Sequence, residues 1–156
     1  MLCHMAARRV QAEESSVSRT TAFLGGRPVL KKTIRSRLDL VPLVRAGLPF
    51  AVLAAVGGRL QLSIESTAES LQLPMRTLAR RKEAGRLDPR ESERIVRLAE
   101  VAAWAKEIFG ETGARQWLEE SNRALGGATP MAMLDTDVGA EAVRDVLGRI
   151  EHGVFS

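Results

Sequence analysis

The chain has 156 residues, of which 45% are hydrophobic and 27% are charged. This balance is typical of a folded globular protein and excludes a chain that is disordered throughout. Aromatic residues make up only 4% and tyrosine is missing, so aliphatic side chains and alanine must build the core. Such a core favours helices over a β-sandwich. We therefore expect an all-α protein.

Cysteine content and hydropathy bear on the compartment. The single cysteine, Cys3, allows no internal disulfide and fits a reducing environment. No stretch approaches 18 uninterrupted apolar residues, so no membrane span is expected. A polar run over 11–16 stands where a secretory signal would have its apolar segment. These features predict a cytoplasmic protein.

Charge is distributed unevenly along the chain. Residues 1–90 carry 16 Lys and Arg against 7 Asp and Glu, whereas residues 91–156 carry 7 against 12. The N-terminal part, residues 1–90, is therefore strongly basic, and the C-terminal part, residues 91–156, is acidic. This asymmetry predicts two different partners, and a polyanion is a natural candidate for the first.

The first third of the chain is expected to form an arm and two short helices. Residues 1–23 are polar, rich in Ser and Thr, and predicted to be a flexible arm. Apolar residues recur at helical spacing over 30–45, although Pro42 interrupts the pattern. Pro49 can open the next helix, because a proline in the first turn loses no hydrogen bond. That helix is expected to stop at Gly57-Gly58.

Residues 66–82 match the logic of a helix-turn-helix. A capping-box pattern predicts that a first helix begins at Ser66, and a second helix is predicted from about Met75 to Ala84. In such a unit the second helix offers a polar face to the major groove, where Arg forks onto guanine and Lys or Thr contacts phosphate. The predicted DNA-binding residues are Arg76, Thr77, Arg80, Arg81 and Lys82.

Two residues depart from the usual helix-turn-helix pattern. Gln72 stands in the turn where glycine is usual, and Arg81 occupies a position often filled by an apolar anchor. The alternative interpretation is that the three consecutive cations at 80–82 form only a solvated helical face. Residue chemistry alone leaves both interpretations open.

The clearest helix start in the chain lies at Asp88-Pro89, with Glu91 completing a capping box. The helix that follows has an apolar face wide enough to require burial from more than one side, and Gly110 is its natural end. Shorter helical pieces are expected over 113–121, 129–134 and 137–152, the last one closed by Gly153.

The sequence holds no pattern that predicts catalysis. The two histidines, His4 and His152, lie at opposite termini and have no neighbours at metal-ligand spacing. No glycine-rich loop joins a strand to a helix, as a phosphate loop requires. Asp135 and Asp137 are best interpreted as acidic residues at a helix N-terminus. We expect no enzyme, no cofactor and no metal site.

Two stretches of sequence together resemble the antitoxin family called Xre/MbcA/ParS. They are Leu73–Lys82 with Gly85-Arg86-Leu87 and Glu91–Arg94, and Ala124–Gly127 with Thr129-Pro130-Met131 and Arg149–Ser156. The resemblance covers residues 24–156. It implies an Xre-like helix-turn-helix domain followed by a toxin-binding domain, in a type II toxin–antitoxin system. It also implies a RES-domain partner toxin that destroys NAD⁺, a blocked toxin active site and repression of the antitoxin's own operon.

The resulting domain prediction has three parts: a flexible arm over 1–23, an Xre-like helix-turn-helix domain over 24–87 and a toxin-binding domain over 88–156. Phe155 is expected to enter a pocket of the partner, because an aromatic side chain is seldom left exposed near a chain end. The alternative is that Phe155 folds back onto its own core. The predicted toxin-binding residues are Arg149, Glu151, His152, Gly153, Val154, Phe155 and Ser156.

Two further functions stay open beside the antitoxin. One is a stand-alone helix-turn-helix transcription regulator whose C-terminal half dimerises. The other is a protein-only inhibitor whose helix-turn-helix has become a dimer interface. For the antitoxin we expect at least a homodimer, because palindromic operators require a two-fold reader and because the apolar face of the helix over 88–109 is wide.

Overall fold

Helices provide the regular structure throughout residues 2–154, the part of the chain that the computed structural model describes. Within this part no strand forms, and one isolated β-bridge joins Pro49 to Arg86. The expected all-α class is confirmed. The elements in chain order are α1 (Leu2–Phe23), α2 (Gly26–Leu30), η1 (Arg37–Asp39), α3 (Leu40–Ala46), α4 (Ala51–Arg59), α5 (Ile64–Ser70), α6 (Met75–Ala84), α7 (Pro89–Glu119), η2 (Arg123–Leu125), η3 (Met131–Asp135) and α8 (Asp137–Glu151).

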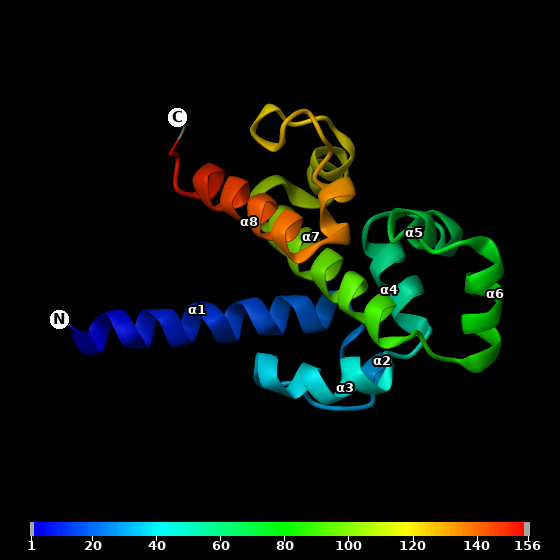
Figure 1. Ribbon diagram of the computed structural model, residues 1–156. Coiled ribbons are helices and arrows are strands. Elements are labelled where there is room, and N and C mark those ends of the chain that lie inside the picture. The colour runs from blue at the N-terminus through cyan, green and yellow to red at the C-terminus, as the bar shows by residue number, and fades with distance from the viewer. Residues whose placement is uncertain (1, 155–156) are drawn as a thin grey trace.

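The long helix α7 organises the fold, and α1, α3, α4 and α8 all pack against it (Figure 1). It begins as predicted, with a capping box. Asp88 Oδ1 accepts from the Glu91 amide and Glu91 Oε2 accepts from the Asp88 amide, each at 2.8 Å. Two orphan donors of the first turn are thereby satisfied, so the start of α7 is fixed locally.

The predicted helix end at Gly110 is present as a kink. Gly110 has φ 78° and ψ 178°, outside helical geometry, and the chain resumes a helix directly after it. A positive φ of this size suits glycine, which has no Cβ to clash with the backbone. The predicted helices over 88–109 and 113–121 are therefore two arms of one bent element.

Residues 2–23 form the helix α1, so the prediction of a flexible arm was wrong. Thr20 and Phe23 are buried, and α1 packs along α7, where Arg19 pairs with Glu107. The N-terminal half of α1 extends past the ends of the neighbouring helices (Figure 1). The apolar stripe of this helix is sparse and its Ser and Thr content is high, which is why composition pointed to a loose arm.

The packing of α1 also changes the argument for a dimer. The apolar face of α7, which seemed too wide for a single neighbour, is covered within the chain by several helices, with side chains such as Leu98, Val101 and Ala105 fully buried. The width of this face therefore gives no support for self-association.

The expected end of α4 at Gly57-Gly58 was also wrong, since α4 continues to Arg59. Gly57 serves helix packing instead. A Cβ at this position would lie 2.4 Å from Thr67 Oγ1 and 2.9 Å from the Leu62 carbonyl oxygen. The missing side chain thus lets α5 and the turn before it approach α4 directly.

The C-terminal helix α8 agrees with its prediction over 137–152. Val143, Val146 and Leu147 are buried against the rest of the domain, at the spacing of a helical face. Thr136 caps the helix by accepting from the Gly139 amide at 3.0 Å. None of the helices over residues 2–154 combines the length and the apolar content that a membrane crossing requires.

Candidate nucleic-acid and partner interfaces

The helix-turn-helix consists of α5 and α6, but α5 begins earlier than predicted. Its cap is Ser63, whose Oγ accepts from the Ser66 amide at 3.0 Å, so the first helical residue is Ile64. Ser66 lies inside the first turn, and the capping box predicted there does not form. Both serines fit the sequence rule for a cap, and only packing decides between them.

The turn between the two helices has the expected tight geometry. Gln72 adopts φ 56°, the left-handed conformation for which glycine is usual. The Leu73 amide donates to the Ala68 carbonyl at 2.8 Å, and Leu71 and Leu73 are both buried. Ala68 is fully buried where the helices meet. Gln72 therefore takes the place where glycine is usual, and the tight turn still forms.

Four of the five predicted DNA-binding residues are accessible on α6. Arg76 and Arg80, four residues apart, share one outward face, whereas Lys82 follows Leu78 by four residues and lies to the side of that face. Arg76, Arg80 and Lys82 are exposed and Thr77 is half-buried, while Leu78 anchors the opposite face. None of the ion pairs found among residues 2–154 involves these three cations. Their donors are thus available to a polyanion or to base edges.

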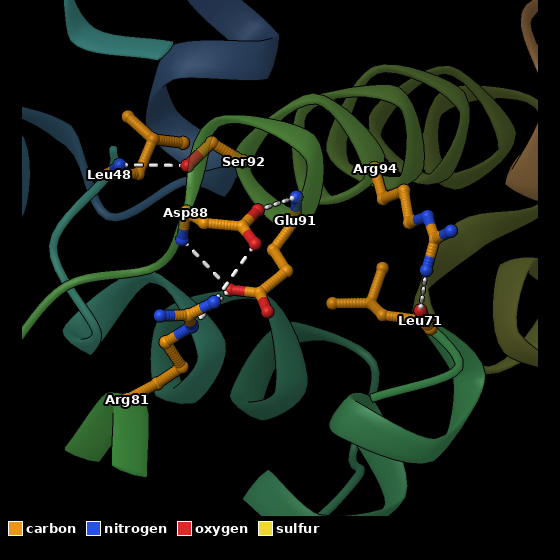
Figure 2. A network of polar contacts seen from close by, with 7 residues as sticks. All are labelled: Leu48, Leu71, Arg81, Asp88, Glu91, Ser92 and Arg94. Atoms are coloured by element: carbon orange, nitrogen blue, oxygen red, sulfur yellow. Dashed lines mark hydrogen bonds and ion pairs between the residues drawn. The ribbon is translucent and has the colours of Figure 1, made fainter. Parts of the chain in front are cut away.

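Arg81 lies apart from this face. Its side chain is only 20% exposed, and its Nε donates to Glu91 Oε2 at 2.8 Å while Nη2 donates to Asp88 Oδ2 at 2.9 Å (Figure 2). The hydrogen bond to the Glu91 carboxylate, in particular, holds the pKa of Arg81 above its ordinary value. This geometry argues against the predicted role of Arg81 in DNA binding, because its charge-assisted bonds join α6 to α7.

The first two turns of α7 also hold two other segments in place (Figure 2). Ser92 Oγ accepts from the Leu48 amide at 2.8 Å, which fixes the α3–α4 turn. Arg94 Nη1 donates to the Leu71 carbonyl at 3.1 Å, at the end of α5. The recognition helix, its turn and the α3–α4 turn are therefore all attached to the N-terminal end of α7.

One arginine of α7 anchors the C-terminal domain. Arg97 donates to the carbonyls of Leu134 and Asp135 at 3.1 Å, and its Nη1 lies 2.8 Å from Asp137 Oδ1. Asp137 thus has a structural partner, in line with its interpretation as a helix N-terminal acid. Among the described residues, no group of three or more His, Cys, Asp or Glu side chains is placed to hold a metal ion.

The end of α8 brings most of the predicted toxin-binding residues together. Arg149, Glu151, His152 and Gly153 are exposed, and Val154 is 56% exposed. Phe155 and Ser156 lie outside the described residues.

The direction in which this tail leaves α8 is set by a Schellman motif. Gly153 has φ 66°, its amide donates to the Ile150 carbonyl at 3.2 Å, and the Val154 amide donates to the Arg149 carbonyl at 2.9 Å. These bonds satisfy carbonyls that the helix end would otherwise leave free. The chain as far as Val154 is thus held in one orientation relative to α8.

Sequence reasoning missed a second set of exposed residues on α8. Val138, Glu141 and Asp145 lie outward, opposite the buried side of the helix, and Val138 is 79% exposed. The signal was available, because the predicted buried residues of this helix leave these positions on the opposite face. The exposed side of α8 and the tail together form a continuous candidate surface for a protein partner.

The two candidate interfaces lie at opposite ends of the molecule, with α6 at one end and the C-terminal tail at the other (Figure 1). The arrangement thus separates a helix-turn-helix from a second exposed helical surface. Comparison with known proteins agrees. Residues 39–100 match the antitoxin Xre-like helix-turn-helix domain, and residues 105–153 match the antitoxin Xre/MbcA/ParS C-terminal toxin-binding domain. By both domains, the chain belongs to the Xre/MbcA/ParS antitoxin family.

Three individual relatives are also named antitoxins. Antitoxin Xre of Yersinia enterocolitica is 42% identical over 87 residues, which are 54% of this chain and 59% of that protein. Antitoxin Xre of Pseudomonas putida is 40% identical over 83 residues, 52% of each chain. The Prs ADP-ribosylating antitoxin of a Sphingobium species is 24% identical over 132 residues, 78% of this chain and 83% of that protein. The chain thus spans between half and three-fifths of the length of these Xre relatives.

Proposed function

We propose that the protein is the antitoxin of a type II toxin–antitoxin system and that it neutralises a RES-domain toxin that degrades NAD⁺. In this proposal the C-terminal region blocks the toxin's active site. The observation that carries it is the fixed exit of the tail from α8, within the segment that matches a toxin-binding domain. A plug must enter its cleft at a defined angle, and the Schellman motif supplies that angle.

The chemistry of the tail suits an enclosed site. Val154 and Phe155 offer an apolar tip that can enter a cleft of the toxin. One relative is named an ADP-ribosylating antitoxin, and ADP-ribosylation uses NAD⁺ as its donor, so the name is compatible with a system built on NAD⁺ chemistry. The protein itself acts by binding and requires no cofactor.

The N-terminal domain is proposed to repress the antitoxin's own operon in the cytoplasm. Arg76 and Arg80 would reach base edges in the major groove, while Thr77 and Lys82 would bind phosphates. The DNA-binding form is proposed to be a homodimer, because an operator with two-fold symmetry needs two recognition helices. Sedimentation at micromolar concentration tests this point. A protein mass of 17.0 kDa without DNA, together with only one 17.0 kDa protein per bound operator duplex, would exclude the homodimer.

The function as a whole is tested by co-expression with the product of the neighbouring gene, which should be a RES-domain protein. The expected result is that the toxin alone lowers cellular NAD⁺ and stops growth, and that the antitoxin restores both. A reporter placed behind the upstream region should be repressed by the antitoxin. If growth stays arrested although the antitoxin is present and folded, the proposed neutralisation is wrong.

A further inference from the structure

Two exposed arginines lie beside the C-terminal end of α6, outside the predicted DNA-binding set. Arg45 belongs to the last turn of α3, and Arg86 follows α6 directly. Neither takes part in the ion pairs found among residues 2–154. The charge of both guanidinium groups is therefore not neutralised by a carboxylate of the described chain.

The backbone holds the segments that carry these arginines against each other. The Phe50 amide donates to the Gly85 carbonyl and the Leu87 amide donates to the Leu48 carbonyl, both at 2.9 Å. At Gly47 a Cβ would lie only 2.1 Å from the Leu87 carbonyl oxygen, so the two backbones are in direct contact there. The α3–α4 turn and the segment after α6 thus form one rigid unit.

The side chain of Arg86 reaches across this joint. Its Nη1 donates to the carbonyl of Ala46 at 3.3 Å, the residue next to Arg45. That single contact leaves most of the five donors of the guanidinium free. Two cations on adjacent segments repel each other, and an anion bound beside them would lower that repulsion. Arg81, only a few residues earlier, shows the contrasting case of an arginine that is neutralised within the chain.

The position relative to α6 indicates which anion is involved. A helix of ten residues is about 15 Å long, whereas the major groove of B-DNA is about 12 Å wide. A recognition helix in the groove turns its N-terminal residues to the base edges, so the segment after its C-terminal end leaves the groove beside the sugar–phosphate backbone. Lys82 in the last turn of α6 and Arg86 just after it lie at such an end.

We infer that Arg45 and Arg86 form a phosphate-binding pair that extends the DNA interface from α6 to the α3–α4 turn. This inference rests on the proposed DNA-binding function and deepens it. The pair would contact the backbone of the duplex, so it would add affinity for any sequence without selecting a base.

The test measures the salt dependence of DNA binding by the full chain. Fluorescence anisotropy titrations use a duplex from the upstream region and a scrambled duplex, each between 50 and 200 mM KCl. The variants are Arg45→Gln/Arg86→Gln and the charge-preserving Arg45→Lys/Arg86→Lys. The matched control is Arg8→Gln/Arg9→Gln, which removes two exposed cations from the far part of α1. Thermal unfolding checks that each variant is folded.

A plot of the logarithm of the association constant against the logarithm of salt concentration has a negative slope. Each lost phosphate contact makes this slope about 0.9 less steep, so the glutamine pair should make it about 1.8 less steep on both duplexes. Wild-type affinity should then fall roughly tenfold more than that of the variant across this salt range. The lysine pair and the α1 control should keep the wild-type slope. A wild-type slope in the glutamine variant would overturn the inference, whereas the proposed role of α6 as the recognition helix would be unaffected.

Two other outcomes separate this inference from the function on which it rests. If the glutamine pair weakens toxin binding but leaves the DNA slope unchanged, the two arginines form a protein contact and the inference is wrong. If wild-type protein binds neither duplex even at 50 mM KCl, both the phosphate pair and the proposed DNA-binding function fail.

Discussion

Arg81 of α6 and Glu91 of α7 face each other across the joint between the two helices, with Nε 2.8 Å from Oε2. Glu91 is also the partner of Asp88 in the capping box that starts α7. The same carboxylate therefore fixes the start of α7 and the orientation of the preceding helix, α6. This relationship decides which arginines of α6 are free to meet DNA.

Replacing Arg81 by alanine should destabilise the fold. The change leaves the carboxylates of Asp88 and Glu91 without their cation in a partly buried place, so we expect the free energy of unfolding to fall by about 1–3 kcal/mol. The exposed neighbour Arg80 is the matched control, and Arg80→Ala should change it by no more than about 0.5 kcal/mol. Urea unfolding followed by circular dichroism measures both. Equal stability of the two variants would contradict the role assigned to Arg81.

The exposed arginines Arg76 and Arg80 should matter for DNA binding and not for stability. Replacing Arg76 or Arg80 by alanine should each cost about 1–3 kcal/mol of binding to the operator and relax the preference at one base position. Lys82→Ala should weaken binding to all sequences alike. Competition titrations with single-base operator variants measure the preference. An Arg76→Ala/Arg80→Ala protein that still discriminates the operator normally would remove α6 as the recognition helix.

Because α1 packs on the core through Phe23, removing this side chain should strongly reduce the stability of the protein. This side chain is only 3% exposed, and the Arg59 guanidinium lies 5.7 Å from its ring centre. Phe23→Ala should therefore lower the free energy of unfolding by about 3–5 kcal/mol, since it leaves a cavity in the core. Met5→Ala, at an exposed position of the same helix, should have little effect. A Phe23→Ala protein as stable as wild type would mean that α1 is not docked in solution.

Local signals in the sequence were reliable where the neighbours along the chain determine the structure. The Asp88–Glu91 capping box followed directly from residue types, and so did the loss of helical geometry at Gly110, although a helix end and not a kink was predicted there. Ser66 failed as a cap because Ser63, three residues earlier, also suits an N-cap and accepts from the Ser66 amide. The choice between equivalent local signals thus depends on tertiary contacts, which the sequence pattern does not contain.

Site residues were predictable only as far as exposure follows from helical spacing. Arg76 and Arg80 were expected on an outward face and lie there. Arg81 could not be separated from them, because its partners come from the following helix. Arg45 was missed altogether, since only the contact between Gly47 and Leu87 brings it to the end of α6.

The central claim is that the C-terminal tail inhibits an NAD⁺-consuming toxin, and the most direct test is NAD⁺ loss catalysed by the purified toxin. The protein is added full-length or without residues 154–156, and a Glu141→Lys/Asp145→Lys variant reports separately on the exposed side of α8. The truncation lies beyond the helix, so fold and DNA binding should persist. The account predicts full inhibition by the intact chain and a sharp loss of inhibition after truncation, even if the complex still forms. Full inhibition by the truncated protein would contradict it and would place the inhibitory surface within 111–150.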